Sequence, residues 1–159
     1  MPKRYGQACP VAKSLELIGE RWTLLIVRDL LRGPARFGDF RKSLRGIAPN
    51  LLSERLKLME DHGLVRRSFY SDHPPRASYE LTDKGRELRV VVGALAMWGS
   101  RHVHRGTALV HEDCGQAVQL GYFCPDCRTR VLGPSVKLRR AERRAAARKR
   151  ARRSRAATT

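Results

Sequence analysis

The spacing of apolar residues between Cys9 and Arg105 changes from helical to alternating and back to helical, and this order limits the possible folds. Apolar residues first recur three and four positions apart in four successive segments. They then alternate with polar residues in two short segments separated by the turn-forming sequence His73-Pro74-Pro75-Arg76. A last helical pattern closes the region. Four helices, a two-stranded hairpin and a closing helix predict an α+β, mainly helical fold, the winged helix-turn-helix.

The boundaries of these elements follow from a few end signals. Pro10 stands at the first position of the first helix, where its missing N–H costs no hydrogen bond. Gly19 and Gly33 end the first two helices, and Thr82 provides an N-cap for the last one. The predicted elements are helices at about 10–18, 21–31, 40–44 and 49–62, a brief extended step at 36–37, strands at 64–70 and 77–81, and one long helix after residue 82.

The segment from Pro49 to His62 is the candidate recognition helix, which we expect to enter the major groove of DNA. Its apolar residues recur at i, i+4 and i+7 and must face the core: Leu52, Leu56 and Met59. The face that remains outward carries the candidate DNA contacts Pro49, Asn50, Ser53, Glu54 and Lys57. The same polar face would suit an ordinary surface helix, but the neighbouring hairpin favours the DNA-binding interpretation.

The hairpin, with its turn over Ser71 to Arg76, is the candidate wing. Arg76 lies near its tip and follows the stiff Pro74-Pro75 pair. A cation held at a fixed distance in this way suits a phosphate or a narrow minor groove. We expect Arg66 and Arg67, at the base of the wing, to add contacts with the DNA backbone.

The chain has a net charge of +18, and much of this charge lies near its C-terminus. From Val136 to Thr159, eleven Lys and Arg residues accompany a single acidic residue, Glu142. Such a segment cannot bury a core and is predicted to be a disordered basic tail. A polycation binds nucleic acid without sequence preference because binding releases counterions. The alternative is a solvated extension that has no target.

Three of the four cysteines form, together with a histidine, two pairs of potential metal ligands. His111 and Cys114 are the first pair, and Cys124 and Cys127 are the second. Two pairs on tight turns provide the four N and S ligands of a structural zinc site, so the sequence predicts a zinc-ribbon-like segment. Idle thiols and a redox dithiol remain as alternatives. A catalytic zinc is not expected, because protein ligands would fill all four positions.

The sequence disfavours several other classes of protein. It has no apolar run near the roughly 20 residues that span a bilayer and no signal-peptide pattern, so we expect a cytoplasmic, nucleoid-associated protein without a membrane partner. It has no paired carboxylates, nucleophile elbow or Gly-rich phosphate loop, and no β/α alternation surrounds the Cys-x-x-Cys pair, so no enzyme is expected. The remaining classes are a sequence-specific DNA-binding regulator and a nonspecific nucleic-acid-binding module dominated by the zinc segment and the tail.

The expected divisions of the chain are an arm at 1–8, the winged-helix domain at 9–105, the zinc-ribbon-like segment at 106–134 and the basic tail at 135–159.

Many short motifs follow one another in a fixed order between Cys9 and His102. They are Cys9-Pro10, Gly19 to Trp22, Arg36-Phe37 with Phe40 and Leu44, Ile47 with Leu52, Leu56 and Met59, Gly63-Leu64-Val65, Pro74-Pro75-Arg76, Tyr79 to Thr82 with Gly85, and Trp98. Together they resemble the HxlR-type winged-helix transcriptional regulators of bacteria. The resemblance implies a homodimer joined through its first and last helices, with two recognition helices in successive major grooves of double-stranded DNA. Ala48 departs from the pattern, because a Ser or Thr N-cap is usual there.

The last helix favours the homodimer on its own evidence. It carries a long apolar stripe: Leu88, Val91, Val92, Leu95, Trp98 and His102. This stripe is larger than a small helical core can cover, so we expect it to pack against a second copy of the chain. Trp22 and Trp98 are assigned to the core rather than to an effector pocket, and no small-molecule effector can be named.

Cys9 is the candidate redox sensor. It precedes Pro10, so its sulfur lies at a helix N-terminus, where the dipole and unpaired N–H groups favour the thiolate. The cations of Lys3, Arg4 and Lys13 act in the same direction. The resemblance implies the same role, because some HxlR-type regulators sense oxidants or quinones through a matching cysteine. The alternative is a buried helix cap of ordinary reactivity.

Overall fold

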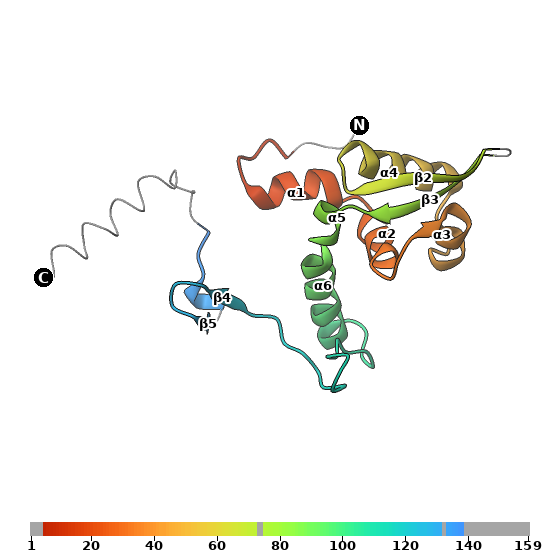
Figure 1. The fold of residues 1–159 in the computed structure, drawn as a ribbon. Helices are drawn as coiled ribbons and strands as arrows, with labels where there is room; N and C mark the ends of the chain where they lie inside the picture. The colour runs from red at the N-terminus through yellow and green to blue at the C-terminus, as the bar shows by residue number, and fades with distance from the viewer. Residues whose placement is uncertain (1–4, 73–74, 132, 139–159) are drawn as a thin grey trace, which may run out of the picture. The chain divides into compact units, whose positions relative to one another are not determined.

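The computed structural model describes residues 5–72, 75–131 and 133–138 (Figure 1). The chain divides into two compact units, Met1–Val118 and Gln119–Thr159, which we describe separately. The domain boundary expected at residue 105 therefore falls inside the first unit. The predicted basic tail lies outside the described residues from position 139 onward. None of the described helices is long and apolar enough to cross a membrane.

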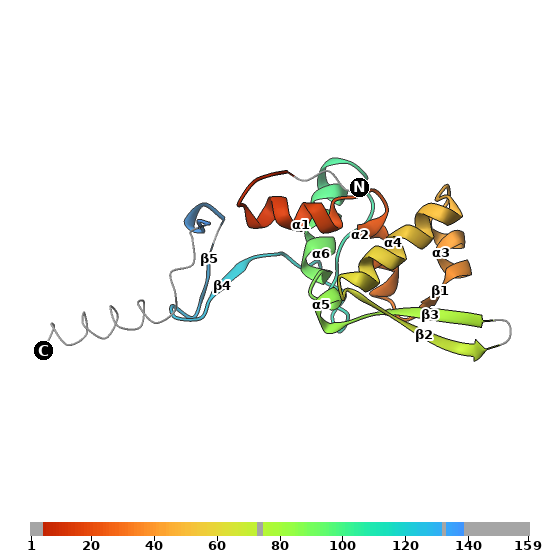
Figure 2. The ribbon, with the colours of Figure 1, turned by 90° about the horizontal axis from the view of Figure 1, so that it is seen from above.

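In the first unit, the described residues form helices and a three-stranded antiparallel sheet. The helices are α1 (Pro10–Ile18), α2 (Thr23–Leu30), α3 (Phe37–Ser43), α4 (Pro49–Asp61), α5 (Asp83–Arg86) and α6 (Arg89–His102), and the strands are β1 (Ala35–Arg36), β2 (Val65–Asp72) and β3 (Pro75–Leu81). The strand order is β1-β3-β2. Figures 1 and 2 show the β2–β3 hairpin projecting beyond the helices, at the end of the unit that holds α3. This arrangement confirms the predicted winged helix-turn-helix fold.

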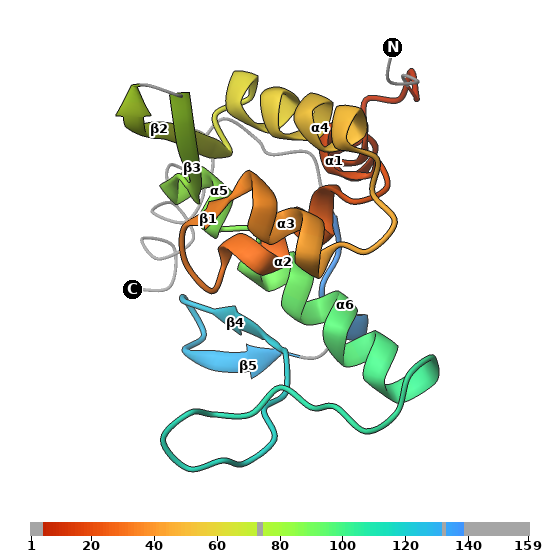
Figure 3. The same cartoon turned by 90° about the vertical axis from the view of Figure 1, so that its right-hand side faces the viewer.

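One hydrophobic core joins α2, α3, α4 and the sheet. Ile26, Phe40, Leu52 and Met59 are fully buried, because each helix turns its apolar stripe toward the same centre. The ring of Phe40 packs edge-on against Tyr79 of β3, with the ring centroids 6.2 Å apart. Complete burial of a side chain of this size contributes about 1.5–3 kcal/mol. The core thereby fixes the rotation of α4, which lies beside the hairpin in Figure 3, and decides which of its residues face solvent.

Three helices differ from the sequence expectation. Helix α3 begins at Phe37, a residue assigned to the extended step, and that step is the strand β1 at Ala35–Arg36. Helix α2 begins at Thr23 instead of Arg21, because Trp22 has a left-handed backbone with φ of +82°. The long helix expected after Thr82 is divided into α5 and α6. At the division, the N–H groups of Leu88 and Val90 bond to carbonyls three positions back, at 3.2 and 3.4 Å, instead of four. A tighter turn therefore separates the two helices.

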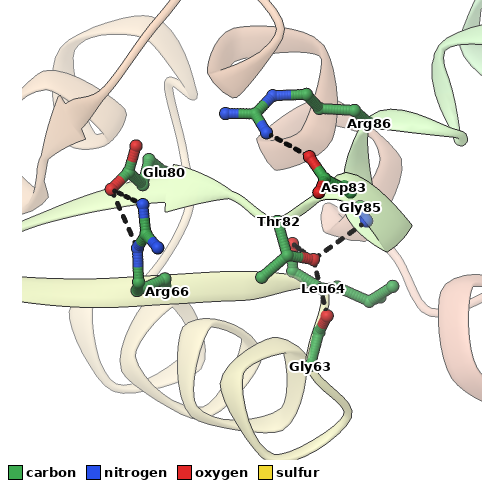
Figure 4. A network of polar contacts seen from close by, with 8 residues as sticks. All are labelled: Gly63, Leu64, Arg66, Glu80, Thr82, Asp83, Gly85 and Arg86. Carbon is green, nitrogen blue, oxygen red and sulfur yellow. Dashed lines mark hydrogen bonds and ion pairs between the residues drawn. The ribbon is translucent and has the colours of Figure 1, made fainter.

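Thr82 joins the end of β3 to the segment that follows α4 (Figure 4). Its Oγ1 accepts a hydrogen bond from the N–H of Gly85 at 3.1 Å, as the predicted N-cap requires, and donates to the carbonyl of Gly63 at 2.7 Å. Gly85 packs closely here, since an added Cβ would lie 2.1 Å from the carbonyl oxygen of Leu64. The contacts hold α5, the end of β3 and the segment after α4 in one fixed arrangement.

The outer face of α6 is open in the single chain. Leu95 is 51% exposed and Trp98 is 60% exposed, whereas Leu88 and Val92 pack against the core. The assignment of Trp98 to the core is therefore wrong. Its ring instead contacts His102 of its own helix, with the ring centroids 5.3 Å apart. Trp22 does pack against the core and is half-buried.

In the second unit, the described residues form a short hairpin of β4 (Tyr122–Cys124) and β5 (Thr129–Val131), followed by the 3₁₀ turn η1 (Gly133–Ser135). The two strands are antiparallel, and Cys124 pairs with Thr129. Among its described residues only Cys124 and Val131 are half-buried, and all the others are exposed. Burial of apolar surface therefore contributes little to the stability of this unit.

Candidate nucleic-acid interface

Helix α4 presents one polar, solvent-facing surface, as the sequence predicted. Its apolar side is buried, and the exposed side carries Asn50, Ser53, Glu54 and Lys57. Pro49 is also exposed and begins the helix behind Ala48, whose side chain makes no cap hydrogen bond. An amide, a hydroxyl, a carboxylate and an ammonium group therefore share one face, and all four are groups that hydrogen-bond the edges of bases in a major groove.

The two arginines at the base of the wing are held by neighbours on the hairpin. Arg66 pairs with Glu80 across the strands, with its Nη2 and Nε atoms 2.7 and 3.0 Å from Glu80 Oε1 (Figure 4). The guanidinium of Arg67 lies over the ring of Phe69, 4.5 Å from its centroid. Both arginines are exposed, but these contacts restrict the positions of their side chains.

Arg76 is the exposed cation nearest the described end of β3. The strands reach further than expected, because β2 continues to Asp72 and β3 begins at Pro75. Arg76 therefore lies on a strand and not in the turn, and it pairs with Ser71 in the ladder. The turn residues 73 and 74 lie outside the described residues. A strand position fixes the direction of this side chain more firmly than a turn would.

Sequence reasoning missed three cations close to α4 in the chain. Arg41 and Lys42 are in the last turn of α3, and Arg45 lies in the connection from α3 to α4. All three are exposed. The first helix of a helix-turn-helix crosses the DNA backbone, so cations at its end are placed for phosphate contacts. The signal was present in the sequence as basic residues in the short helix before α4 and in the connection that follows it.

Cys9 is the N-cap residue of α1, but its sulfur makes no cap hydrogen bond. The thiol is half-buried. Lys13, one turn further, forms an ion pair with Glu16 at 3.0 Å, so its charge is partly neutralised within the helix. Lys3 and Arg4 lie outside the described residues. Cys9 therefore occupies the cap position of α1 without acting as a hydrogen-bonding cap.

The structure brings the predicted zinc ligands together as two pairs. His111 Nδ1 lies 3.3 Å from Cys114 Sγ, and Cys124 and Cys127 share a hydrogen bond between their side chains. Among the described residues, no group of three or more His, Cys, Asp and Glu side chains gathers at metal-binding distance. All four cysteines are free thiols.

The two thiols of the second pair differ in acidity. The backbone N–H of Cys127, its thiol and the N–H of Asp126 bond to the sulfur of Cys124 and lower the pKa of Cys124. The hydrogen bond to Cys124, and then the charge of that sulfur, raise the pKa of Cys127. Cys124 is therefore the member of the pair that ionises first.

Comparisons with known proteins agree with this geometry. The model of the HxlR-like helix-turn-helix family matches residues 17–107. The chain belongs to this family. It is 37% identical over 130 residues to the HTH-type transcriptional regulator Rv3095 of Mycobacterium tuberculosis, a match that covers 79% of this chain and 82% of that protein.

Solved structures support the family assignment of this HxlR-type chain. The crystal structure of PA1607, named as a transcription factor, is 35% identical with a TM-score of 0.71 and covers 86% of this chain and 97% of its own. The redox regulator HypR in its oxidized form is 32% identical with a TM-score of 0.57, covering 62% of this chain and 100% of its own. The HxlR-type chain is thus a DNA-binding transcriptional regulator from a family without enzymatic activity, as the sequence predicted.

Proposed function

We propose that this HxlR-type protein is a sequence-specific regulator that binds an inverted-repeat operator in double-stranded DNA as a homodimer. The observation that carries the proposal is the exposed polar face of α4, held beside a wing that carries Arg76. A buried apolar side keeps that face turned to solvent without any conformational change. A rigid reading surface of this kind pays little ordering entropy when it binds.

Each exposed group of α4 has a matching base edge in the major groove. The amide of Asn50 can bond adenine N6 and N7, Glu54 can accept from cytosine N4, and Lys57 can donate to guanine. Arg76 would contact phosphate or the adjacent minor groove, together with Arg41 at the end of α3. The α4 contacts would set sequence preference, and the other two would set affinity for any duplex.

The homodimer would bury apolar surface that the single chain leaves open. Large apolar side chains are at least 38% exposed on α1 and α6: Val11, Leu15, Val90, Val91, Leu95 and Trp98. Soluble monomers rarely expose so many large apolar side chains on neighbouring helical turns. A two-fold dimer through these helices would place two α4 helices about 34–36 Å apart, one turn of B-DNA.

Cys9 would make this dimer responsive to oxidants or electrophiles. It begins α1, which also carries Val11 and Leu15 of the exposed apolar surface. A peroxide would oxidise the thiol to a sulfenic acid, and condensation with Cys9 of the partner subunit would form a disulfide and release water. Such a change at the interface would shift one α4 against the other and weaken operator binding. HypR, a relative with a similar structure, is a redox regulator.

The test measures affinity and preference separately. The operator is located by footprinting duplexes from the region upstream of the chain's own gene, and binding is followed by fluorescence anisotropy with bulk duplex as competitor. Asn50→Ala and Ser53→Ala should relax preference at particular base pairs, by about 1–3 kcal/mol each. Arg76→Ala should weaken binding to every duplex, whereas Arg86→Ala, a cation paired with Asp83 on α5, serves as the control.

The second candidate function is nonspecific nucleic-acid binding through the C-terminal segment. The concentration of basic residues after Val136 favours it. Under this alternative, competition by bulk duplex would equal competition by the operator fragment. Replacement of Asn50, Ser53 and Lys57 together, without any change in preference or affinity, would contradict the role of α4 in recognition.

A further inference from the structure

A sharp turn over residues 19–22, which we name the α1–α2 corner, joins α1 to α2. The N–H of Gly19 donates to the carbonyl of Leu15 at 2.9 Å, and an added Cβ at Gly19 would lie 2.5 Å from that oxygen. Trp22 has a φ of +82°, which a bulky side chain adopts only where the surrounding structure imposes it. The guanidinium of Arg21 lies over the Trp22 ring, 5.0 Å from its centroid. The corner therefore has one closely determined conformation.

An ion pair joins the α1–α2 corner to the recognition helix. Arg55, in the middle of α4, places its Nη2 atom 3.3 Å from Oε2 of Glu20 in the corner. Only 16% of the Arg55 side chain is exposed, compared with 39% of the Glu20 side chain. Among the described residues, no other ion pair involves α4. Glu20 is thus the carboxylate that holds this guanidinium.

A largely buried arginine at this position is unfavourable for stability alone. Leu51 and Leu58, four positions before and three after Arg55, lie on the same side of α4 and are half-buried. In the part of the chain that the structure describes, the buried Nε of Arg55 has no hydrogen-bond partner. Burial takes water from the guanidinium, and an apolar residue of similar volume would avoid that desolvation cost. The reason for an arginine here is therefore to be sought in something other than stability.

An ion pair supplies direction, which apolar packing does not. The contact of an N–H group with a carboxylate has a preferred distance and angle, so it fixes how two elements are oriented. Helix α1 ends at the corner and carries Val11 and Leu15 of the exposed apolar surface. Helix α4 carries the proposed base contacts. The pair of Arg55 with Glu20 therefore links the helix proposed to meet the partner subunit to the helix proposed to meet DNA.

We propose that Arg55 is a positioning residue that, through Glu20, fixes the angle between α1 and α4 and so sets the half-site spacing that the dimer accepts. This role rests on the proposed function, a homodimer on an inverted repeat. Two α4 helices related by a two-fold axis fit successive major grooves at one separation and one rotation. One added base pair moves a half-site by about 3.4 Å and turns it by about a tenth of a helical turn. Arg55 acts on this spacing and not on the identity of the bases.

The test compares duplexes that differ in half-site spacing. The operator fragment located by footprinting is prepared with its natural spacing, with one base pair added or removed between the half-sites, and as an isolated half-site. Dissociation constants are measured for the full-length wild type, Arg55→Met, Glu20→Gln and the double variant. Arg86→Met is the matched control, because its ion pair with Asp83 lies within α5 and joins no second element.

The wild type and Arg86→Met should bind the altered spacings about tenfold or more weakly, comparable to the cost of a mismatched base pair. Arg55→Met and Glu20→Gln should lose less than about threefold on the same duplexes, and should bind the isolated half-site as the wild type does. The double variant should match either single variant, since both remove one contact. The melting temperature of Arg55→Met should equal or exceed that of the wild type, because methionine replaces an imperfectly paired charge.

Wild-type spacing discrimination in Glu20→Gln would overturn the proposal, even if Arg55→Met lost it, because Arg55 would then act by direct contact with DNA. A lower melting temperature with unchanged discrimination would assign the pair a structural role alone, and additive losses in the double variant would show that the two residues act separately. Glu20→Gln, at the more exposed position, decides the result if Arg55→Met does not fold. A wild type that binds the operator no better than bulk duplex would refute the proposed function together with this role. A retained operator preference with unchanged discrimination in the variants would refute only the positioning role.

Discussion

Replacing Thr82 by Val tests the joint between β3 and the segment that follows α4. The two side chains have nearly the same shape, so the substitution removes the hydroxyl and little else. Thr82 Oγ1 accepts from the N–H of Gly85 at 3.1 Å and donates to the carbonyl of Gly63 at 2.7 Å. Thr82→Val leaves both backbone groups without this partner in a half-buried position.

The magnitude follows from the two hydrogen bonds. Loss of an N-cap costs about 1 kcal/mol, and loss of a second hydrogen bond costs about 1 kcal/mol more. The free energy of unfolding should therefore fall by about 2 kcal/mol, which lowers Tm by roughly 8–12 °C in a domain of this size. Thr82→Ser keeps the hydroxyl and should lose less than about 0.5 kcal/mol, because serine is an equally good cap.

Urea unfolding followed by circular dichroism measures these differences at equilibrium. Operator affinity should stay unchanged at temperatures well below the transition, since Thr82 is not among the proposed DNA contacts. If Thr82→Val were as stable as the wild type, the hydroxyl would not hold the joint. If Thr82→Ser, which keeps the hydroxyl, were as unstable as Thr82→Val, loss of the two hydrogen bonds would not explain the destabilisation.

Four further predictions address the core, the dimer, the sensor and the tail. Gly85→Ala should destabilise the fold by more than Thr82→Val, because its Cβ would lie 2.1 Å from the Leu64 carbonyl oxygen. Gly38→Ala has open space around the added Cβ, so its free energy of unfolding, measured in thermal melts, should rise by about 0.5–1 kcal/mol. Leu95→Asp should give a monomer in analytical ultracentrifugation while the melting transition remains, and an intact dimer would contradict the proposed interface. Diamide or a quinone should release operator DNA from the wild type but not from Cys9→Ser. Equal release from both proteins would exclude Cys9 as the switch. The zinc content of both proteins is checked in parallel, since loss of metal could cause the same release. Deleting residues 136–159 should flatten the salt dependence of duplex binding between about 50 and 200 mM and leave operator preference intact.

Much of the candidate site could be predicted from the sequence, because it lies on a strongly amphipathic helix. The spacing of Leu52, Leu56 and Met59 determined which face of α4 is buried, and the four polar contact candidates follow from that face alone. The ion pair of Arg66 with Glu80 could not be predicted, since it depends on the pairing register of β2 and β3. The exposed cations Arg41 and Lys42 of α3 were missed because helical periodicity draws attention to apolar positions.

The amino-acid sequence by itself determined the order of elements, the helix ends marked by Pro10 and the Thr82 cap, and the outward face of α4, because these depend on neighbours within one turn. The tertiary structure decided features that depend on distant residues. The close packing of Gly85 against Leu64 and the exposure of Trp98 both arise where segments far apart in the chain meet or fail to meet. Local patterns state which side chains are apolar, but only the assembled fold decides whether one chain has enough surface to cover them.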